Sequence, residues 1–196
     1  VVHFSTSEVY GDPVIIPTPE QYNGNVVTMG PRAAYDESKR VSETLCWLYH
    51  QKGVKVRIVR PFNLYGPGYS LQDGRVIPAL MNAALNGAPF PLFGDGGATR
   101  TFCYLRDAAA QIFAVAERGV DGEVYNIGNG DEEVSVFQLL AVMRGVADIV
   151  VDEQFTKHDF TQPHRRRPDI AKVLKIAPPP EVGLKDGLKR TLESYK

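Results

Sequence analysis

The stretch VVHFSTSEVYGDP, residues 1–13, decides how this chain folds. Val1, Val2 and Phe4 are typical of a buried parallel strand. The polar residues Ser5–Glu8 follow directly after this strand. Open α/β sheets bind their ligands beyond the carboxyl ends of the strands. The run of hydroxyl side chains and a glutamate therefore indicates a reaction centre at this end of the first strand.

Apolar runs that suit strands alternate with runs of helical periodicity along the chain. Strands are expected at 1–5, 54–61 and 123–128, and helices at 35–52, 75–86 and 106–118. Weaker patterns indicate a helix at 134–145 whose start is marked by Ser135, a strand at 148–153 and a last helix at 184–195. The helix at 35–52 has an apolar stripe for packing, made of Val41, Leu45 and Leu48. The alternation predicts βαβ units and a mostly parallel sheet.

The composition is that of a globular protein with a sizeable core, because 43% of the 196 residues are hydrophobic and 23% are charged. A formal net charge of -1 predicts no general attraction to nucleic acid or to an acidic membrane. The two cysteines, Cys46 and Cys103, indicate neither a zinc site nor a disulfide framework, which favours a reducing, cytoplasmic location. The histidines show no metal-binding spacing, and no apolar run reaches the roughly 18 residues of a membrane span.

The stretch YDESK, from Tyr35 to Lys39, lies at the start of the expected helix at 35–52. A spacing of four places both side chains on one helical face, where the ammonium of Lys39 can favour the ionised form of the phenol. Such a pair could use Tyr35 as a general base near neutral pH. The spacing alone is also compatible with a solvated helix face.

Several further motifs accompany YDESK in a fixed order: STSEVYGDP, NVVTMGPRAAYDESKRVSETL, RPFNLYGPG, LFGDGGATRTFCYLRD, YNIGNG and HRRRPDI. With them the chain resembles the extended short-chain dehydrogenase/reductase family over essentially its whole length, and within it the decarboxylases that convert UDP-glucuronic acid to UDP-xylose. The resemblance implies an α/β fold: the C-terminal half of a Rossmann-type parallel sheet with a smaller mixed α/β substrate-binding region. It assigns 1–66 to the second half of the NAD-binding domain, with 106–128 returning to it. The nucleotide-sugar-binding region is then mainly 67–196.

The resemblance also implies a reaction with NAD as cofactor. Tyr35 would accept the proton of the C4 hydroxyl of the sugar, while Lys39 would hold the nicotinamide ribose and tune the phenol. Thr6 would bond to the sugar hydroxyl or to the tyrosine, and Ser7 and Glu8 would face C5 and the carboxylate end of the sugar. A 4-keto group β to the C6 carboxylate makes loss of carbon dioxide easy, and reduction of the ketone then closes the cycle without net oxidation.

The pair Ser7–Glu8 bears on which reaction of the family is expected. Nucleotide-sugar 4,6-dehydratases typically have Asp-Glu there, because elimination of water needs an acid as well as a base. Ser7 can hydrogen-bond a substrate carboxylate without repelling it, which favours a decarboxylase. A 4-epimerase remains an alternative, since it needs only the tyrosine, the lysine and the hydroxyls. Ordinary turn capping before Gly11 is the alternative for Ser5–Ser7 themselves.

The resemblance assigns further roles along the chain. Substrate binding falls to Ser7, Glu8, Asn63, Arg75, Phe93, Arg100 and Arg166, and cofactor binding to Ser5, Tyr35, Lys39, Pro61 and Phe62. Arg166 would anchor phosphate or carboxylate and assist protonation of the enolate through a water. Its neighbours Arg165 and Arg167 are expected to be surface charges. For the whole basic run HRRRPD, the alternative is a solvated charged loop or a patch that binds nucleic acid. Arg75 could instead be a helix-start charge, and Phe62 a core residue.

The Gly-rich turn of the family, G-x-x-G-x-x-G after a first strand, does not occur in these residues. We therefore expect the chain to bind NAD poorly by itself, since pyrophosphate affinity depends on backbone amides at that turn. Three interpretations follow: the carboxyl-terminal portion of an active decarboxylase, an epimerase or dehydratase of the same family, or a binding or assembly module without turnover. A homodimer is expected through the outer face of the helix at 35–52, which carries Leu45, Trp47, Leu48 and Tyr49.

Overall fold

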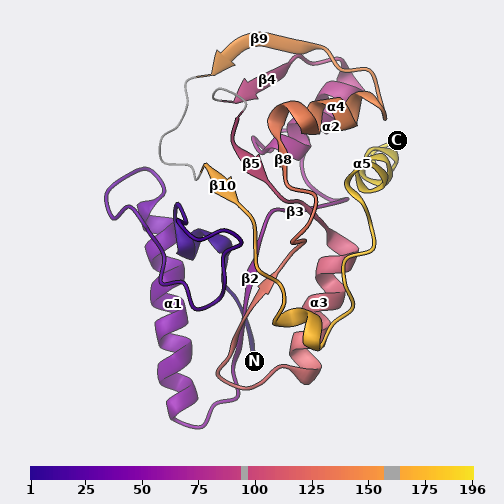
Figure 1. Ribbon diagram of the computed structural model, residues 1–196. Coiled ribbons are helices and arrows are strands. Elements are labelled where there is room, and N and C mark those ends of the chain that lie inside the picture. Colours follow the sequence, from indigo (N-terminus) through magenta and orange to yellow (C-terminus); the bar gives the residue numbers. More distant parts are fainter. Residues whose placement is uncertain (94–96, 157–163) are drawn as a thin grey trace.

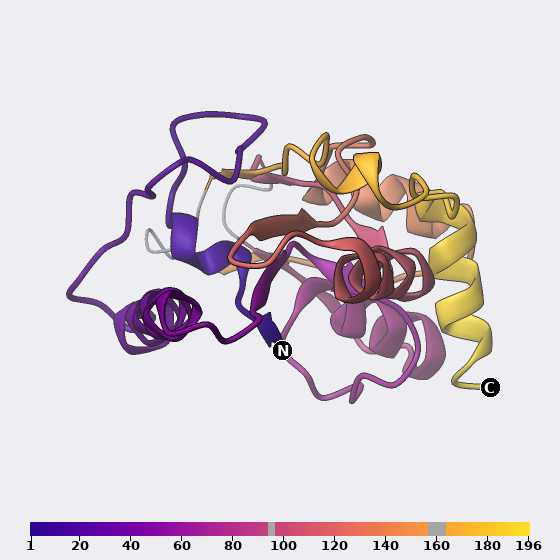
Figure 2. The ribbon, with the colours of Figure 1, turned by 90° about the horizontal axis from the view of Figure 1, so that it is seen from below.

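A three-stranded parallel sheet lies at the centre of the computed structural model, which describes residues 1–93, 97–156 and 164–196. Its strands are ordered β1 (Val2–Phe4), β2 (Arg57–Pro61) and β7 (Val124–Ile127). Helix α1 (Ala33–Gln51) stands on one side of this sheet and α3 (Leu105–Arg118) on the other (Figures 1 and 2). The parallel β1–β2 and β2–β7 pairings confirm the predicted α/β class with a parallel sheet.

The second part of the structure combines short strands with helices. The remaining helices are η1 (Ser7–Tyr10), α2 (Val76–Asn86), α4 (Val136–Arg144), η2 (Val173–Lys175) and α5 (Leu184–Glu193). The remaining strands are β3 (Leu64–Tyr65), β4 (Phe90–Phe93), β5 (Thr99–Arg100), β6 (Cys103–Tyr104), β8 (Val134–Ser135), β9 (Val151–Thr156) and β10 (Arg165–Arg166). They pair as β10–β5–β8, β3–β6 and β4–β9, so this part is mixed rather than one continuous sheet.

Each of these parts has a large apolar cluster at its core. One joins β2, β7 and α3 through residues such as Val59, Tyr125 and Ala108, so α3 packs on the central sheet. The other joins α2, α4 and α5 through residues such as Leu80, Leu139 and Leu188. The proposed boundary between 1–66 and 67–196 remains a prediction.

The helices follow the sequence pattern closely. Ser135 caps α4, as predicted: its hydroxyl accepts from the Gln138 amide, and the Gln138 side chain accepts from the Ser135 amide in return. The predicted strand at 148–153 was misplaced, because β9 runs from Val151 to Thr156. Among the described helices, none combines the length and apolarity that crossing a bilayer requires.

Helix α1 differs from the prediction in the face that it buries. Its expected packing stripe is exposed, with Val41, Leu45 and Leu48 at 56%, 49% and 45%. Asp36 is the buried residue of this helix, within the described chain. No described element covers the apolar face of α1, so periodicity identified the helix but not what it packs against.

Candidate active site

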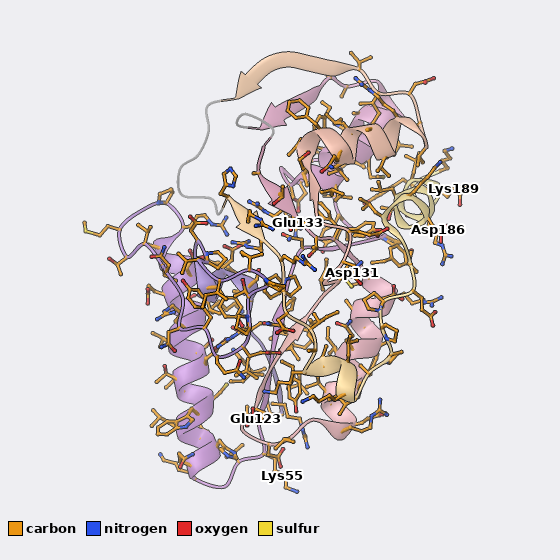
Figure 3. The ribbon with its side chains drawn as sticks, viewed as in Figure 1. Lys55, Glu123, Asp131, Glu133, Asp186 and Lys189 are labelled. Carbon is orange, nitrogen blue, oxygen red and sulfur yellow. The ribbon has the colours of Figure 1, made fainter. Side chains whose placement is uncertain are left out.

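The carboxyl ends of the three central strands meet at one edge of the sheet, because the strands are parallel. Ser5–Glu8 follow β1, Phe62 and Asn63 follow β2, and Gly128 follows β7. Strand β10, with Arg166, adds to this edge from the end of the chain. Figure 3 labels Lys55 and Glu123 near the opposite, amino-terminal end of the sheet and Glu133 on the carboxyl side.

Glu8 and Arg166, 158 positions apart in sequence, form the central contact of this edge. The guanidinium of Arg166 binds both oxygens of the Glu8 carboxylate, with Nη2 donating to Oε2 at 2.8 Å and Nη1 to Oε1. Arg32, directly before α1, adds a second cation at 2.9 Å from Oε1. The side chains of Glu8 and Arg166 are only 13% and 7% exposed, so the pair is largely shielded from water. The structure thus brings together two residues that the sequence assigned to the reaction.

The arginines decide the ionisation of Glu8. Burial by itself would raise the pKa of this carboxyl, but the charge and hydrogen bonds of Arg166, followed by those of Arg32, outweigh it and hold the pKa below its ordinary value. Glu8 is therefore a carboxylate near neutral pH, with its oxygens committed to arginines. It can orient a guanidinium toward an anionic substrate, but it is a weak proton acceptor.

Asp36 is a second carboxyl next to this ion pair. The residue is 7% exposed, and its Oδ1 is buried without a hydrogen-bond partner among the described residues. Burial raises the pKa of Asp36, and the nearby charge of Glu8 raises it further, against the opposing effect of Arg32. The two carboxyls of the site therefore differ: Glu8 is held ionised, and Asp36 is biased toward its protonated form.

Tyr35 and Lys39 lie in the first turns of α1, on the side of the sheet where Arg32 meets Glu8. The Lys39 ammonium donates to the carbonyl oxygen of Phe4 at 2.9 Å, which fixes it at the carboxyl end of β1. Tyr35 is 48% exposed, and within the described part of the chain no hydrogen bond of its phenol is found. A half-exposed phenol one helical turn before a fixed ammonium suits a group that meets its partner only when substrate is bound.

The hydroxyl residues after β1 are engaged locally. Thr6 caps η1, since its Oγ1 accepts from the Glu8 amide at 3.3 Å. Ser5 donates to Oε1 of Glu43 at 2.5 Å, and Ser7 is buried at 4% exposure. For Thr6, the structure therefore shows the capping role that was given above as the alternative. The assigned contacts of Ser5, Thr6 and Ser7 with cofactor or sugar remain predictions.

The other assigned residues are placed as follows. Asn63 donates to the carbonyl of Thr101, and Arg100 donates to the carbonyls of Thr99 and His164. Burial, followed by the neighbouring charge of Arg166, lowers the pKa of Arg100 to about 10. Two cationic groups are therefore close together, which suits the binding of an anion.

Four further residues were assigned to the nucleotide and nicotinamide sites. Arg75 precedes α2 and pairs with Asp73 at 2.6 Å on the surface, in keeping with the helix-start alternative. Phe62 is 2% exposed and packs on Tyr10 with ring centroids 5.9 Å apart, so it is a core residue, while Pro61 before it is half-buried. The side chain of Phe93 lies outside the described residues.

Comparisons with known proteins identify the family of this chain. A family model described as the NAD dependent epimerase/dehydratase family matches residues 1–128. The chain belongs to this family. NAD is the family's cofactor, and solved neighbours contain it.

The curated relatives of this epimerase/dehydratase chain include decarboxylases. The chain is 39% identical over 194 residues to UDP-glucuronic acid decarboxylase 1 of Xenopus tropicalis and equally so to UDP-glucuronic acid decarboxylase 3 of Arabidopsis thaliana. The alignments cover 98% of this chain but 46% and 56% of those proteins, so the chain spans about half their length.

Solved structures of related enzymes share the fold. A mutant UDP-glucuronic acid 4-epimerase from Bacillus cereus, in complex with UDP-4-deoxy-4-fluoro-glucuronic acid and NAD, superposes with a TM-score of 0.87 at 28% identity over 98% of this chain and 60% of that one. A dTDP-glucose 4,6-dehydratase from Streptomyces venezuelae gives 0.84 at 30% identity, over all of this chain and 59% of that one. Epimerases and dehydratases thus share this fold, and the fold alone does not select the reaction.

Sequence reasoning did not single out several charged residues that form ion pairs in or next to this candidate site, most clearly Arg32, Glu43 and Arg60. A signal existed for Arg60, which interrupts an apolar strand with a charge that must be paired if buried. Arg167 was expected to be a surface charge. Instead its Nε donates to the carbonyl of Gly130 at 2.6 Å and helps to hold the segment that contains Arg166. Arg165 is exposed and pairs with Glu133, the residue labelled in Figure 3.

The lowered pKa of Glu8 predicts how stability depends on pH. A carboxyl whose pKa is depressed by folding stabilises the folded state above its ordinary value of 4.5, and this contribution is lost as the pH falls toward the folded pKa. The wild type should therefore exceed Glu8→Gln in unfolding free energy by a steady amount above about pH 5, and the difference should shrink at lower pH. Denaturant unfolding at a series of pH values measures this. The exposed Glu117→Gln serves as control, and a difference that stays constant down to about pH 3 would contradict the role of the arginines.

Proposed function

We propose that this chain forms the substrate-converting part of an enzyme that decarboxylates UDP-glucuronic acid to UDP-xylose through a 4-keto intermediate. The observation that carries the proposal is the buried Glu8–Arg166 pair beside the start of the helix with Tyr35 and Lys39. A guanidinium held by an internal carboxylate suits the recognition of a substrate carboxylate. The similarity to UDP-glucuronic acid decarboxylases supports the same substrate.

The described residues fit the nicotinamide end of NAD. The Lys39 ammonium stands at the carboxyl end of β1, where dinucleotides bind in open α/β sheets, and the half-exposed Tyr35 precedes it by one turn of α1. The Gly-rich turn that binds the pyrophosphate is not among these 196 residues. When bound, NAD supplies the hydride acceptor and later the hydride donor of the cycle.

The chain's own residues then account for the proton and charge movements. Tyr35 takes the proton of the C4 hydroxyl, and Lys39 stabilises the phenolate that does so. Arg166, oriented by Glu8, holds the anionic end of the sugar and, after carbon dioxide leaves, assists protonation of the enolate through a water. Asn63 and Arg100 bind the nucleotide diphosphate, and Arg75, Phe93, Pro61 and Phe62 keep the nucleotide and nicotinamide roles that the resemblance assigns.

One assay separates the proposed reaction from its alternatives. The longest natural polypeptide that contains this chain is incubated with UDP-glucuronic acid and NAD, and carbon dioxide and the nucleotide sugars are measured. Carbon dioxide together with a UDP-pentose is the expected result. A UDP-hexuronic acid epimer without carbon dioxide would show a 4-epimerase. Loss of water from dTDP-glucose in a parallel incubation, without release of carbon dioxide from UDP-glucuronic acid, would show a dehydratase.

If none of these nucleotide sugars is converted, the proposal is also overturned. An intact mass near 21.7 kDa for the purified protein would then favour a binding or assembly module. A homodimer through the exposed apolar face of α1 and a cytoplasmic location are proposed with this function, and size-exclusion chromatography tests the dimer.

A further inference from the structure

Helix α1 is attached to the rest of the protein mainly by polar contacts. Its large apolar side chains Trp47 and Tyr49 are each 56% exposed. A pocket of about 320 Å³, lined in part by Trp47, Ile58 and Val124, lies between this helix and the central sheet. Figure 2 shows α1 set apart from the sheet. Within the described residues, polar contacts therefore fix the inner face of the helix, whose first turns carry the reactive segment Tyr35–Lys39, while its outer apolar face is left for the proposed dimer.

Glu43 makes the most direct connection between α1 and the sheet. Both of its oxygens bind the guanidinium of Arg60 on β2, with Nε donating to Oε1 at 2.9 Å and Nη2 to Oε2 at 2.6 Å. Their side chains are 13% and 11% exposed, so this is a shielded bidentate ion pair. Oε1 also accepts from Ser5 at 2.5 Å. One carboxylate therefore joins the helix, the sheet and the residue that opens the segment Ser5–Glu8.

Arg60 is itself held in place by contacts with residues other than Glu43. Its Nη1 donates to the hydroxyl of Tyr10 at 2.7 Å and to the carbonyl of Glu20 at 2.9 Å, and the guanidinium lies 4.7 Å from the centre of the Tyr10 ring. Tyr10 in turn donates to Oδ1 of the fully buried Asn126 on β7 at 2.8 Å. Burial raises the pKa of Tyr10 to about 12, which keeps its hydroxyl available as a donor. These contacts of Arg60 do not depend on Glu43.

We propose that the Glu43–Arg60 ion pair positions the reactive segment of α1 relative to Ser5–Glu8. This inference rests on the proposed function. Glu43 lies one helical turn beyond Lys39, so a small displacement at Glu43 moves the whole reactive segment. Further contacts assist, from Lys39 to the Phe4 carbonyl, from Arg40 to the carbonyls of Val9 and Asn23, and between Ser42 and the His3 ring at 2.9 Å, but none of them is a bidentate ion pair. Glu43 and Arg60 act through Tyr35 and do not contact the reacting atoms.

The test compares Glu43→Gln with Asp121→Asn in the longest natural polypeptide that contains the chain. Asp121 pairs with Arg57 at 3.1 Å, at the other end of β2, so its variant removes a single, more exposed ion pair from the same strand. Glu43→Gln should lower kcat by about ten- to a hundredfold with KM changed less than about threefold, because misplacement by an ångström affects the chemical step far more than binding. Asp121→Asn should keep kcat within about twofold.

Two further variants separate positioning from simple loss of stability. Glu43→Asp keeps the negative charge, so its kcat should lie between those of the wild type and Glu43→Gln. If Glu43→Gln does not fold, Glu43→Asp is compared with Asp121→Asn in its place. Arg60→Met should lower kcat to a similar extent. The double variant should be no worse than the poorer single one, because both remove the same contact. Equal kcat in Glu43→Gln and Asp121→Asn, or additive losses in the double variant, would overturn the inference.

Hydrogen exchange provides a readout that does not depend on the substrate. In Glu43→Gln, peptides that cover 5–10 and 33–43 should exchange faster, while the rest of the chain stays as in the wild type. If the wild type converts no nucleotide sugar, the proposed function fails but this local change still tests positioning. Uniformly faster exchange, or the same pattern in Asp121→Asn, would assign Glu43 a purely structural role.

Discussion

Replacement of Tyr35 by phenylalanine should lower turnover of UDP-glucuronic acid about a thousandfold while the affinity for the UDP-sugar stays within about threefold. A positioned general base contributes roughly a hundred- to ten-thousandfold to a reaction, and phenylalanine removes only the phenolic oxygen. The folded structure should tolerate the change, because Tyr35 is 48% exposed and its phenol makes no hydrogen bond within the described chain. Initial-rate kinetics and isothermal titration with UDP-sugar measure the two effects.

Tyr49→Phe is a matched control for this experiment. Tyr49 lies near the end of the same helix and is 56% exposed, so its variant loses a phenolic oxygen of similar accessibility far from the sheet edge. We expect its turnover to equal that of the wild type. Unchanged turnover in Tyr35→Phe, or an equal loss in both variants, would rule out the phenol as the base.

Replacement of Arg166 by alanine should affect both stability and the release of carbon dioxide. The change leaves the Glu8 carboxylate shielded from water with Arg32 as its remaining cation. Loss of one partner from a buried pair costs about 3–5 kcal/mol, and the lower end applies because Arg32 stays in place. If Arg166 also holds the anionic end of the sugar, carbon dioxide release should fall by about a hundredfold or more, as for loss of one donor to a developing charge.

Arg165→Ala is the control for Arg166→Ala, because it removes the neighbouring arginine of the same strand. The side chain of Arg165 is 49% exposed and pairs with Glu133, so its loss should cost less than about 1 kcal/mol and leave carbon dioxide release unchanged. Denaturant unfolding and a carbon dioxide assay at saturating substrate give the two quantities. Full carbon dioxide release by folded Arg166→Ala would remove this residue from the mechanism, whatever its effect on stability.

The sequence predicted the central sheet and the main helices because those elements carry strong local patterns. Alternating strands and helices gave β1, α1, β2, α3 and β7, and the Ser135 cap gave the start of α4. Strands of two residues, such as β3 and β6, were missed because so short a segment has no periodicity to read. The packing of α1 was wrong because an apolar stripe does not indicate which element covers it.

The candidate site was predicted in part. Motif order indicated Glu8 and Arg166 separately, but no local pattern shows that residues 158 positions apart form a bidentate pair. Arg32 and Glu43 were missed for the same reason, since each gains its role from a partner that is distant in sequence. A charge in a buried strand, as at Arg60, is the kind of signal that could have found one of these pairs.

The Glu8–Arg166 contact also determines when the site can form during synthesis. A ribosome makes residue 8 long before residue 166, and until then the Glu8 carboxylate lacks its main partner. Closing so long a loop is entropically costly, so this contact forms after the local helices and strands that it links. The nascent chain therefore completes this edge of the sheet only after residue 166 has been translated.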